Sequence, residues 1–394
     1  MRKIYLDYAA TTPVDPRVLK TMIPYFKEIF ANASSLHGPG QQAKKAMEEA
    51  REKVARLIKA EPEEIIFTSS GTEADNYALK GVFYAVNKSP VHIITSCIEH
   101  SAILKTGQFL EKQGVKITYL PVNKQGLVDP ENITKAILPK TILVSIMHAN
   151  NEIGTIQPIK EIGKIVKAER NKRTKAKNNL PIYFHTDAVQ TFGHIPIDVV
   201  DLGVDLLSVS AHKLYGPKGV GALYIKEGIK LVSLIHGGDQ ERERRGSTEN
   251  IAGLVGFGQA CEIADQEMDS EAEYLTELRD YFIDQVMNKI KNVELNGHPQ
   301  KRLPNNINLS IVGVEGEAII ISLDMEGIAI STGSACFSTS LKPSHVLLSL
   351  GLSHQQAHSA LRFSLGRWTK KKDLDYTIKS LIPMIKRLRK ISPF

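Results

Sequence analysis

Chemically reactive side chains stand where apolar stretches of the sequence end. The stretch "VDLLSVSA" (204–211) contains Ser210 and leads directly into His212 and Lys213, and a glycine–proline turn follows. Because no helical pattern follows to solvate it, a lysine at this place loses part of its hydration, as lysines that form Schiff bases with aldehydes do. The stretch therefore indicates a reactive amine, with an ordinary surface lysine as the alternative.

A glycine turn follows a second apolar stretch. "EIIFTS" (64–69) runs through Ser70 into Gly71 and Thr72, where a helical pattern begins. The backbone N–H groups at such a helix start suit a phosphate. An ordinary capping box from Ser70 to Glu73 is the alternative explanation.

Three further stretches end in polar residues that suit a cofactor. "PIYFHTDA" ends in a carboxylate, Asp187, with Gln190 just beyond; "TILVSIMH" is followed by Asn151, and "VHIITS" by His100. A buried carboxylate is costly unless it is paired or hydrogen-bonded, and a helix cap is the simpler explanation for it. Together these stretches supply a phosphate cradle, an acid for a ring nitrogen, an amine for an aldehyde and a flat ring to stack, which is typical of a pyridoxal-phosphate site.

A lone cysteine occurs in a segment that can hardly pack. Cys336 lies among small polar residues in "ISTGSACFSTSLKPS" (330–344). A free cysteine is usually a small buried hydrophobe, and a Ser/Thr/Gly-rich run is usually just a loop. Because such a loop cannot bury its thiol, the combination favours an exposed, reactive cysteine.

The composition is typical of a globular protein of the reducing cytosol. The chain has 394 residues, of which 42% are hydrophobic and 24% charged, so two domains are expected. Three cysteines without a C-x-x-C pair argue against a disulfide framework or a structural zinc site and favour a cytoplasmic location. No stretch has the roughly 18 apolar residues of a membrane span or the pattern of a signal peptide. The basic run 167–179 lacks interleaved aromatic residues, so it predicts a solvated surface rather than a nucleic-acid site.

Short β-rich stretches alternate with helix-like ones, which predicts an α/β fold with a mostly parallel sheet. Near residues 256–269 the pattern changes to a long helical region that leads into a second part of the chain. We expect a large cofactor-binding domain at 16–265 and a smaller domain made of 1–15 and 266–394, which carries the Cys336 loop. Seven strands are expected in the large domain, at 64–69, 91–96, 115–120, 141–148, 181–188, 204–211 and 221–226.

Over nearly its whole length the sequence resembles the cysteine desulfurases of the bacterial iron–sulfur assembly and nitrogenase-associated type. The resemblance is carried, in order, by "YLDYAATTPVDPRV", "EIIFTSSGTEADN", "ILVSIMHANNEIGTIQP", "SAHKLYGPKGVGALY", "STGSAC" and "LRFSLGR". It implies the aspartate-aminotransferase-like fold of fold type I pyridoxal-phosphate enzymes, with a seven-stranded sheet, and a homodimer.

The resemblance also implies roles for individual residues. Pyridoxal 5′-phosphate would be attached to Lys213, with His100 stacked on its ring and Asp187 at its ring nitrogen. Gln190 and Asn151 would lie close to the cofactor, and Asn151 also close to the substrate. Arg362 would bind the substrate carboxylate, for which a guanidinium is well suited. The phosphate would be held by Gly71, Thr72, Ser210 and His212, and by Thr248 from the other subunit.

The implied reaction removes sulfur from L-cysteine. Cys336 as thiolate would take the sulfur as a persulfide and leave alanine, and an iron–sulfur scaffold or other acceptor protein, including one for tRNA thiolation, would then receive it. No metal is expected in the resting enzyme, although a cluster transiently bound through Cys336 is compatible with the family. The alternatives are a selenocysteine lyase or another pyridoxal-phosphate enzyme of the same fold, and a non-catalytic protein-binding platform.

Some positions depart from the pattern of the family. Asp239 and Glu243 stand where glycine is usual, and Ser247 replaces a glycine before Thr248. Negative charges facing a phosphate would weaken its binding, so we expect both carboxylates to point away. Ala31 and Ala33 stand where glycine and proline are typical of the family, and we interpret this as a local difference in the backbone. The basic end "MIKRLRKISPF" predicts a surface to which an acidic acceptor is steered.

Overall fold

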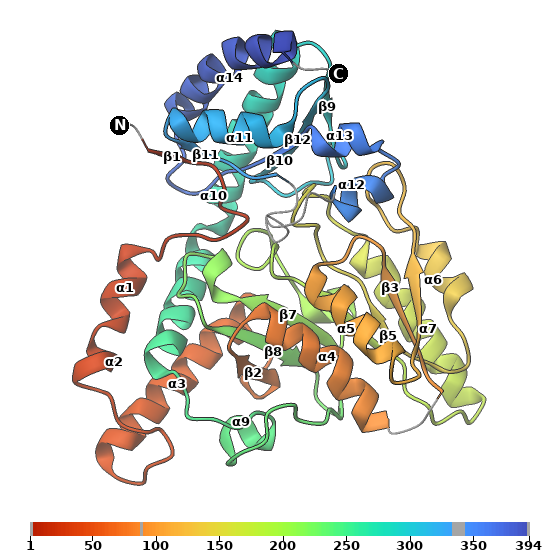
Figure 1. Ribbon diagram of the computed structural model, residues 1–394. Helices are drawn as coiled ribbons and strands as arrows, with labels where there is room; N and C mark the ends of the chain where they lie inside the picture. Colours follow the sequence, from red (N-terminus) through yellow and green to blue (C-terminus); the bar gives the residue numbers. More distant parts are fainter. Residues whose placement is uncertain (1–2, 87–89, 333–342, 392–394) are drawn as a thin grey trace.

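The computed structural model describes residues 3–86, 90–332 and 343–391. Cys336 and most of the 330–344 segment therefore lie outside the described residues. The described part has two lobes, each built on its own sheet, and one long helix runs through both (Figure 1). No helix in these residue ranges is long and apolar enough to cross a membrane.

The large lobe is built on a seven-stranded sheet with the strand order β2-β8-β7-β6-β5-β3-β4. β8 runs antiparallel to both β2 and β7, while the pairs from β7 to β4 are parallel. Each strand is short and apolar and lies within one of the seven stretches expected from the sequence, so the mostly parallel α/β sheet is confirmed. The strands are β2 (Ile65–Thr68), β3 (His92–Ser96), β4 (Lys116–Leu120), β5 (Thr141–Ser145), β6 (Tyr183–Asp187), β7 (Leu206–Ser210) and β8 (Gly221–Ile225).

Helices cover both faces of this sheet because its strands are apolar on both faces. Phe67 and Leu207 pack into one buried cluster, while their chain neighbours Ile66 and Leu206 pack into another. The first cluster joins the sheet to α3 (Gly38–Leu57), α7 (Ile159–Lys175) and the first half of α10 (Ile251–Lys289), and the second joins it to α4 (Gly71–Val86) and α5 (Ser101–Glu111). The shorter helices of this lobe are α1 (Pro16–Met22), α2 (Pro24–Lys27), α6 (Pro130–Ala136), α8 (Val199–Leu202) and α9 (Gln240–Glu243), with the 3-10 turns η1 (Pro62–Glu64) and η2 (Ala211–Lys213).

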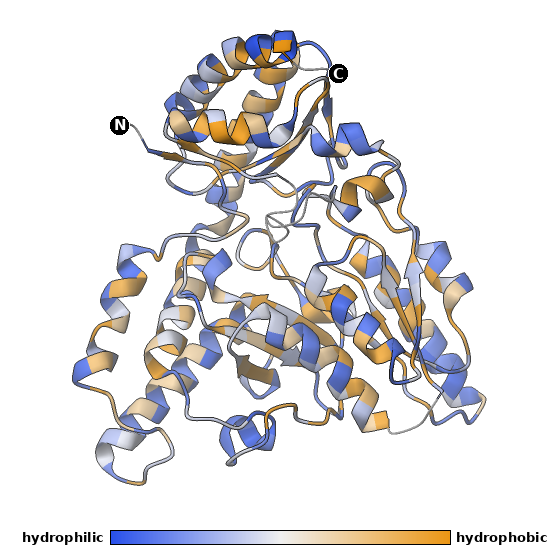
Figure 2. Ribbon diagram, in the orientation of Figure 1, coloured by the Kyte–Doolittle hydropathy of each residue, from blue (hydrophilic) through white to orange (hydrophobic). Residues whose placement is uncertain are grey.

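The small lobe is built on an antiparallel sheet with the order β12-β10-β9, which is β12 (Ala360–Ser364), β10 (Asn306–Ile311) and β9 (Val293–Leu295). A parallel pair, β1 (Ile4–Tyr5) and β11 (Ile328–Ala329), lies beside it. Its core also takes in α11 (Gly316–Met325), α14 (Lys371–Ile391) and the second half of α10. Two short helices, α12 (His345–Ser349) and α13 (His354–His358), precede β12. Figure 2 shows hydrophobic residues along the strands and α11, whereas α13 is largely hydrophilic.

Helix α10 connects the two cores. Ala264 packs in a core cluster of the large lobe and Leu275 in that of the small lobe. At the other end of the chain, Ile4 and Leu6 belong to the small-lobe core and Val18 to that of the large lobe. The domain boundaries at residues 15–16 and 265–266 stay a prediction.

Candidate functional site

A cavity of about 360 Å³ lies where the parallel strands of the large sheet end. Such an edge gathers the residues that follow several strands, although they are far apart in the sequence. Thr248 does not line the cavity, and Cys336 lies outside the described residues; every other predicted site residue lines it. The lining residues are Ala9, Ala10, Ser70, Gly71, Thr72, Asp75, Glu99, His100, Ser101, Met147, Ala149, Asn151, Glu152, Asp187, Val189, Gln190, Ser210, His212, Lys213, His345 and Arg362.

The glycine turn forms one wall of the cavity. A Cβ atom at Gly71 would lie 2.6 Å from Val189 Cγ2, so a larger residue here would require the Val189 side chain to move. The Ser70 hydroxyl accepts a hydrogen bond from Glu73 N at 3.2 Å, which is one half of the expected capping box. The Glu73 carboxylate instead accepts from Ser69 N at 2.8 Å and pairs with Arg245 at 3.0 Å. The start of the sixteen-residue helix α4 therefore presents an anion-binding end at the cavity.

Lys213 ends the 3-10 turn that follows β7, and its amine is held by the N-terminal segment. The Nζ atom donates to Ala9 O at 2.6 Å and to Ala10 O at 2.7 Å. Gln190 Nε2 donates to the same Ala9 oxygen at 3.1 Å. The sequence reasoning missed Ala9 and Ala10: their motif, "YLDYAATTP", carried the resemblance but was given no role.

Asp187 is the last residue of β6 and is 7% exposed. Its Oδ1 accepts from Val189 N at 2.9 Å. Burial raises the pKa of Asp187, while the charges of His100 and Lys213 act in the opposite direction. The charges of His100 and Lys213 thus offset part of the cost of burying the carboxylate, and the hydrogen bond from Val189 N accounts for one of its oxygens.

His100 serves as the N-cap of α5. Its Nδ1 accepts from Ala102 N at 3.2 Å, which assigns the proton of a neutral ring to Nε2. His212, which precedes Lys213 in the chain, also lines the cavity, and its Nδ1 lies 3.1 Å from Thr11 Oγ1. Burial and the charge of Lys213 lower the pKa of His212 to about 4, so this ring is neutral at physiological pH.

Three buried carboxyl groups line the cavity in addition to Asp187. Burial, together with the neighbouring Asp187, raises the pKa of Asp75 well above its ordinary value. Burial raises the pKa of Glu99 to about 8 and that of Glu152 to about 7. At neutral pH, Glu99 is therefore mainly protonated, so its side chain adds little negative charge near an anionic ligand. The sequence reasoning gave these residues no role, because burial and not residue type sets them apart.

Arg362 lies on β12 and is 2% exposed. Its Nη2 donates to Asp7 Oδ1 at 2.8 Å and its Nη1 to Asn151 O at 3.0 Å. The buried Nε has no hydrogen-bond acceptor within the described residues. Because buried donors are nearly always hydrogen-bonded, this guanidinium fits an anionic ligand in the cavity.

The loop that carries Thr248 lies elsewhere in its own chain. Thr248, Asp239 and Glu243 are exposed and do not line the cavity, so in their own chain neither carboxylate faces the glycine turn. The phosphate contact of Thr248 from another subunit stays a prediction. Glu241 in the same loop is buried and binds Arg51 of α3 at 2.7 Å.

The lining residues fit pyridoxal phosphate. The cavity combines an amine, a buried carboxylate, a helix N-terminus that begins with glycine, and an arginine whose buried Nε–H has no acceptor among the described residues. Each of these groups matches one part of the cofactor or of an amino-acid substrate.

Comparisons with known proteins agree with this chemistry. The model of the family "Aminotransferase class-V" matches residues 4–377. The "Cysteine desulfurase IscS" of Dictyoglomus turgidum is 56% identical over 393 residues, which cover 100% of this chain and 97% of that protein. A solved "NIFS-LIKE PROTEIN" has a TM-score of 0.88 at 39% identity and covers 99% of both chains. The structure "SspA in complex with cysteine" has a TM-score of 0.80 at 37% identity and covers 93% of this chain and 100% of that one.

Proposed function

Because the chain belongs to the aminotransferase class-V family, and within it to the cysteine desulfurases, we propose that its cavity removes the sulfur of L-cysteine and passes it to Cys336. The observation that carries the site assignment is the convergence of Lys213, Asp187, His100 and Arg362 on one cavity from four separate parts of the chain. A non-catalytic platform would have no need to keep these four groups together.

Pyridoxal phosphate is the cofactor of the family, and this cavity would hold it through named groups. Lys213 would bind its aldehyde carbon, and Asp187 would keep a proton on its ring nitrogen. The N–H groups of Gly71 and Thr72, with Ser210 and His212, would bind its phosphate. When bound, the cofactor withdraws electrons from the α-carbon of an amino acid.

Arg362 and Asn151 would orient the substrate. The guanidinium of Arg362 lies against the carbonyl of Asn151, so both residues act from the same side of the cavity. Because Nε has no acceptor among the described residues, a substrate carboxylate would satisfy a donor that is already buried. The side chain of L-cysteine would then point away from Arg362.

Cys336 would take the sulfur atom as a thiolate. A bond forms between its Sγ and the substrate sulfur while the C–S bond of the substrate breaks, so Cys336 is oxidised to a persulfide and the substrate carbon is reduced. The carbon skeleton then takes up a proton and leaves as L-alanine. His100, whose Nδ1 is engaged as a helix cap, would carry protons on Nε2.

The direct test measures both products. Purified, cofactor-loaded protein with L-cysteine and a thiol reductant should release sulfide and alanine in equal amounts. Alanine without sulfide, or neither product, would contradict the proposal. L-selenocysteine in a parallel assay separates a desulfurase from a selenocysteine lyase, because a lyase would turn over the selenium compound and not L-cysteine.

We also propose that the enzyme is a homodimer. Phe26, Phe30 and Leu36 occur within one short segment and are 62%, 75% and 93% exposed. Exposed apolar side chains of this size suit a contact with another protein surface. Light scattering should give twice the chain mass, and a variant with Phe26 and Phe30 changed to Ser should give a lower mass.

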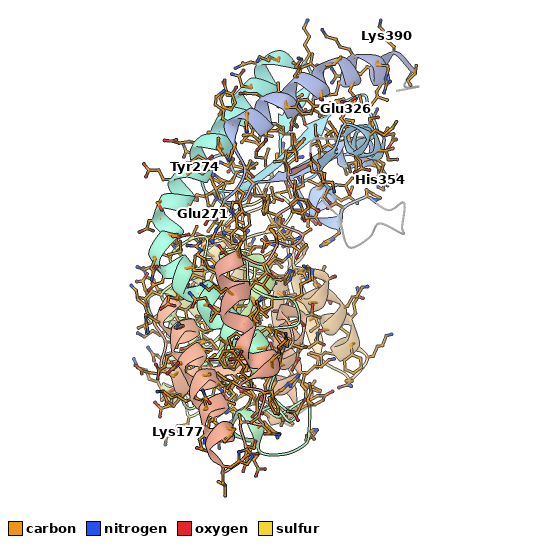
Figure 3. All side chains as sticks on the ribbon, turned by 90° about the vertical axis from the view of Figure 1, so that its left-hand side faces the viewer. Lys177, Glu271, Tyr274, Glu326, His354 and Lys390 are labelled. Atoms are coloured by element: carbon orange, nitrogen blue, oxygen red, sulfur yellow. The ribbon has the colours of Figure 1, made fainter. Side chains whose placement is uncertain are left out.

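Sulfur acceptors, including an iron–sulfur scaffold, would approach a basic surface on α14. Lys386, Arg387 and Lys390 are exposed, and Lys390 lies near the end of the molecule opposite Lys177 (Figure 3). Arg389, in contrast, donates to the carbonyl of Val312 and so stabilises the fold.

A cytoplasmic location also stays a proposal, supported by the small cysteine content.

The test of this surface is charge reversal. Changing Lys386, Arg387 and Lys390 to Glu should weaken binding of an acidic acceptor at low salt and remove most of its salt dependence. The control reverses three exposed lysines on α7, at positions 164, 167 and 175. Equal effects from both triple variants would refute a specific role for α14.

A further inference from the structure

The N-terminal motif folds into a strap, which we define as residues 7–12, that lines the cavity through Ala9 and Ala10 and contacts both lobes. On one side Leu6 O accepts from Ser364 N at 2.7 Å, and Ala9 N donates to Ser364 Oγ at 2.8 Å. On the other side Thr12 N donates to His212 O at 3.1 Å. The strap is thus fixed to β12 of the small lobe and to the lysine turn of the large lobe.

Within the strap, Asp7 is the charged partner of Arg362. The two side chains form an ion pair at 2.8 Å, in which Arg362 is 2% and Asp7 18% exposed. The Tyr5 hydroxyl, with a single hydrogen to donate, lies 3.0 Å from the carbonyl oxygen of Asp7 and 3.1 Å from that of Thr11, and so connects the two ends of this bend. Asp7 is therefore held in place by backbone contacts and not by Arg362 alone.

These contacts leave the guanidinium with one orientation. Asp7 binds Nη2 and the Asn151 carbonyl binds Nη1, so two different elements fix the plane of the group. The Nε donor has no acceptor among the described residues. A buried guanidinium without its counter-charge would be costly, and it would be free to turn toward other acceptors.

We propose that Asp7 is a positioning residue that sets Arg362 for the α-carboxylate of the substrate, and so contributes to selectivity for amino acids over simple amines. The inference rests on the proposed function in taking Arg362 as the carboxylate site. Asp7 itself acts through Arg362 and does not contact the substrate. Its neighbours Ala9 and Ala10 hold Lys213, so one segment positions groups at both the substrate and the lysine end of the cavity.

The test compares two ligands that differ only in the carboxylate. L-alanine and ethylamine are titrated against the cofactor-loaded protein, and binding is followed by the change in cofactor absorbance. Asp7→Ala should weaken L-alanine binding by about tenfold to hundredfold, the size expected for a small misplacement of a binding group, and leave ethylamine binding unchanged. Asp7→Asn keeps an oxygen acceptor for Nη2, so its affinity for L-alanine should be no more than about threefold weaker than that of wild type. The affinity should even rise if the Asp7 carboxylate competes with the ligand carboxylate for Arg362, because asparagine removes that charge.

Asp280→Ala is the matched control. Asp280 also pairs with a buried arginine, Arg279, at 2.8 Å, but neither residue lines the cavity. The control should change neither affinity. In an Arg362→Ala background, Asp7→Ala should have no further effect on L-alanine binding, because the residue that Asp7 positions is absent.

Several outcomes would overturn the inference. One is a parallel loss of L-alanine and ethylamine binding in Asp7→Ala, which would show a general structural role. Another is an Asp7→Asn variant as impaired as Asp7→Ala, and a third is an additive loss in the Arg362→Ala background. The variants could show the expected differences in L-alanine and ethylamine binding while the wild-type protein releases no sulfide from L-cysteine. That result would support the role of Asp7 and refute the proposed function.

Discussion

Replacing Glu241 by Gln should destabilise the large lobe strongly, although the change removes only one charge. The Glu241 side chain is 3% exposed and pairs with Arg51, which is also 3% exposed. Its carboxylate accepts from Arg51 Nη1 at 2.7 Å, from Arg51 Nη2 at 2.9 Å and from Phe67 N at 2.8 Å. A glutamine would keep one acceptor oxygen, but its NH₂ group would face N–H donors of Arg51 or Phe67, with which it cannot form a hydrogen bond.

The expected loss is about 3 kcal/mol, the lower end for a broken buried ion pair, because Arg51 keeps a second and more exposed partner, Glu48, at 3.0 Å. The control is Glu262→Gln. Glu262 binds Lys53, which lies on the same helix as Arg51, at a similar distance of 2.8 Å, but the two side chains are 32% and 28% exposed. A pair this accessible to solvent should contribute about 0–1 kcal/mol. Glu241 has a positive φ of 47°, a backbone conformation that costs Glu and Gln about the same free energy. The difference in stability between wild type and Glu241→Gln therefore reports the loss of the charge.

Urea denaturation followed by circular dichroism measures both variants. The double variant Arg51→Met with Glu241→Leu should recover part of the loss, since apolar residues of similar volume often replace a buried pair without penalty, whereas the buried Phe67 N–H loses its acceptor. A loss below about 1 kcal/mol for Glu241→Gln, or equal losses for Glu241→Gln and Glu262→Gln, would refute the reasoning. The same loop leads to Thr248, so Glu241→Gln should also weaken any phosphate contact made by that residue.

Three further predictions concern the cavity and the cysteine. Lys213→Ala should remove the absorbance of lysine-bound cofactor while the circular dichroism spectrum stays unchanged, and an unaltered absorbance would contradict the assignment. Cys336→Ser should keep the cofactor and the spectral response to L-cysteine but form no persulfide, because a hydroxyl is un-ionised at neutral pH, whereas sulfide release at the wild-type rate would make Cys336 a bystander. Burial raises the pKa of Glu99 from 4.5 to about 8, so the stability associated with its protonated form is fully present below pH 4.5 and is lost as the pH rises through 8. Glu99→Gln cannot ionise and should therefore gain stability relative to wild type between pH 5 and pH 9 in urea denaturation, and a constant difference over this range would refute the raised pKa.

The sequence alone determined the large sheet and most of the cavity lining. Short apolar stretches with turn residues between them predicted all seven strands, because local pattern dictates where a buried strand starts and ends. Lys213, Asp187 and His100 could be picked out because they follow such strands directly, and the carboxyl ends of parallel strands meet at one edge.

Local pattern was misleading where a tertiary partner competes for the same group. The capping box from Ser70 to Glu73 is only half formed, since the Glu73 carboxylate binds Arg245, which is 172 positions away. Arg389 reads as part of a basic surface, yet its guanidinium donates to the carbonyl of Val312. In both cases a charged side chain found a partner that sequence spacing does not reveal.

Only the tertiary structure decided what holds the reactive groups in place. Asp7 and Arg362 are 355 positions apart, and Ala9 is 204 positions from Lys213, so no periodicity links them. The raised pKa values of Asp75 and Glu99 likewise depend on burial by elements from distant parts of the chain. The residue types of the site follow from sequence because they are chemically distinctive, whereas their orientation and charge depend on contacts that exist only after the lobes pack together.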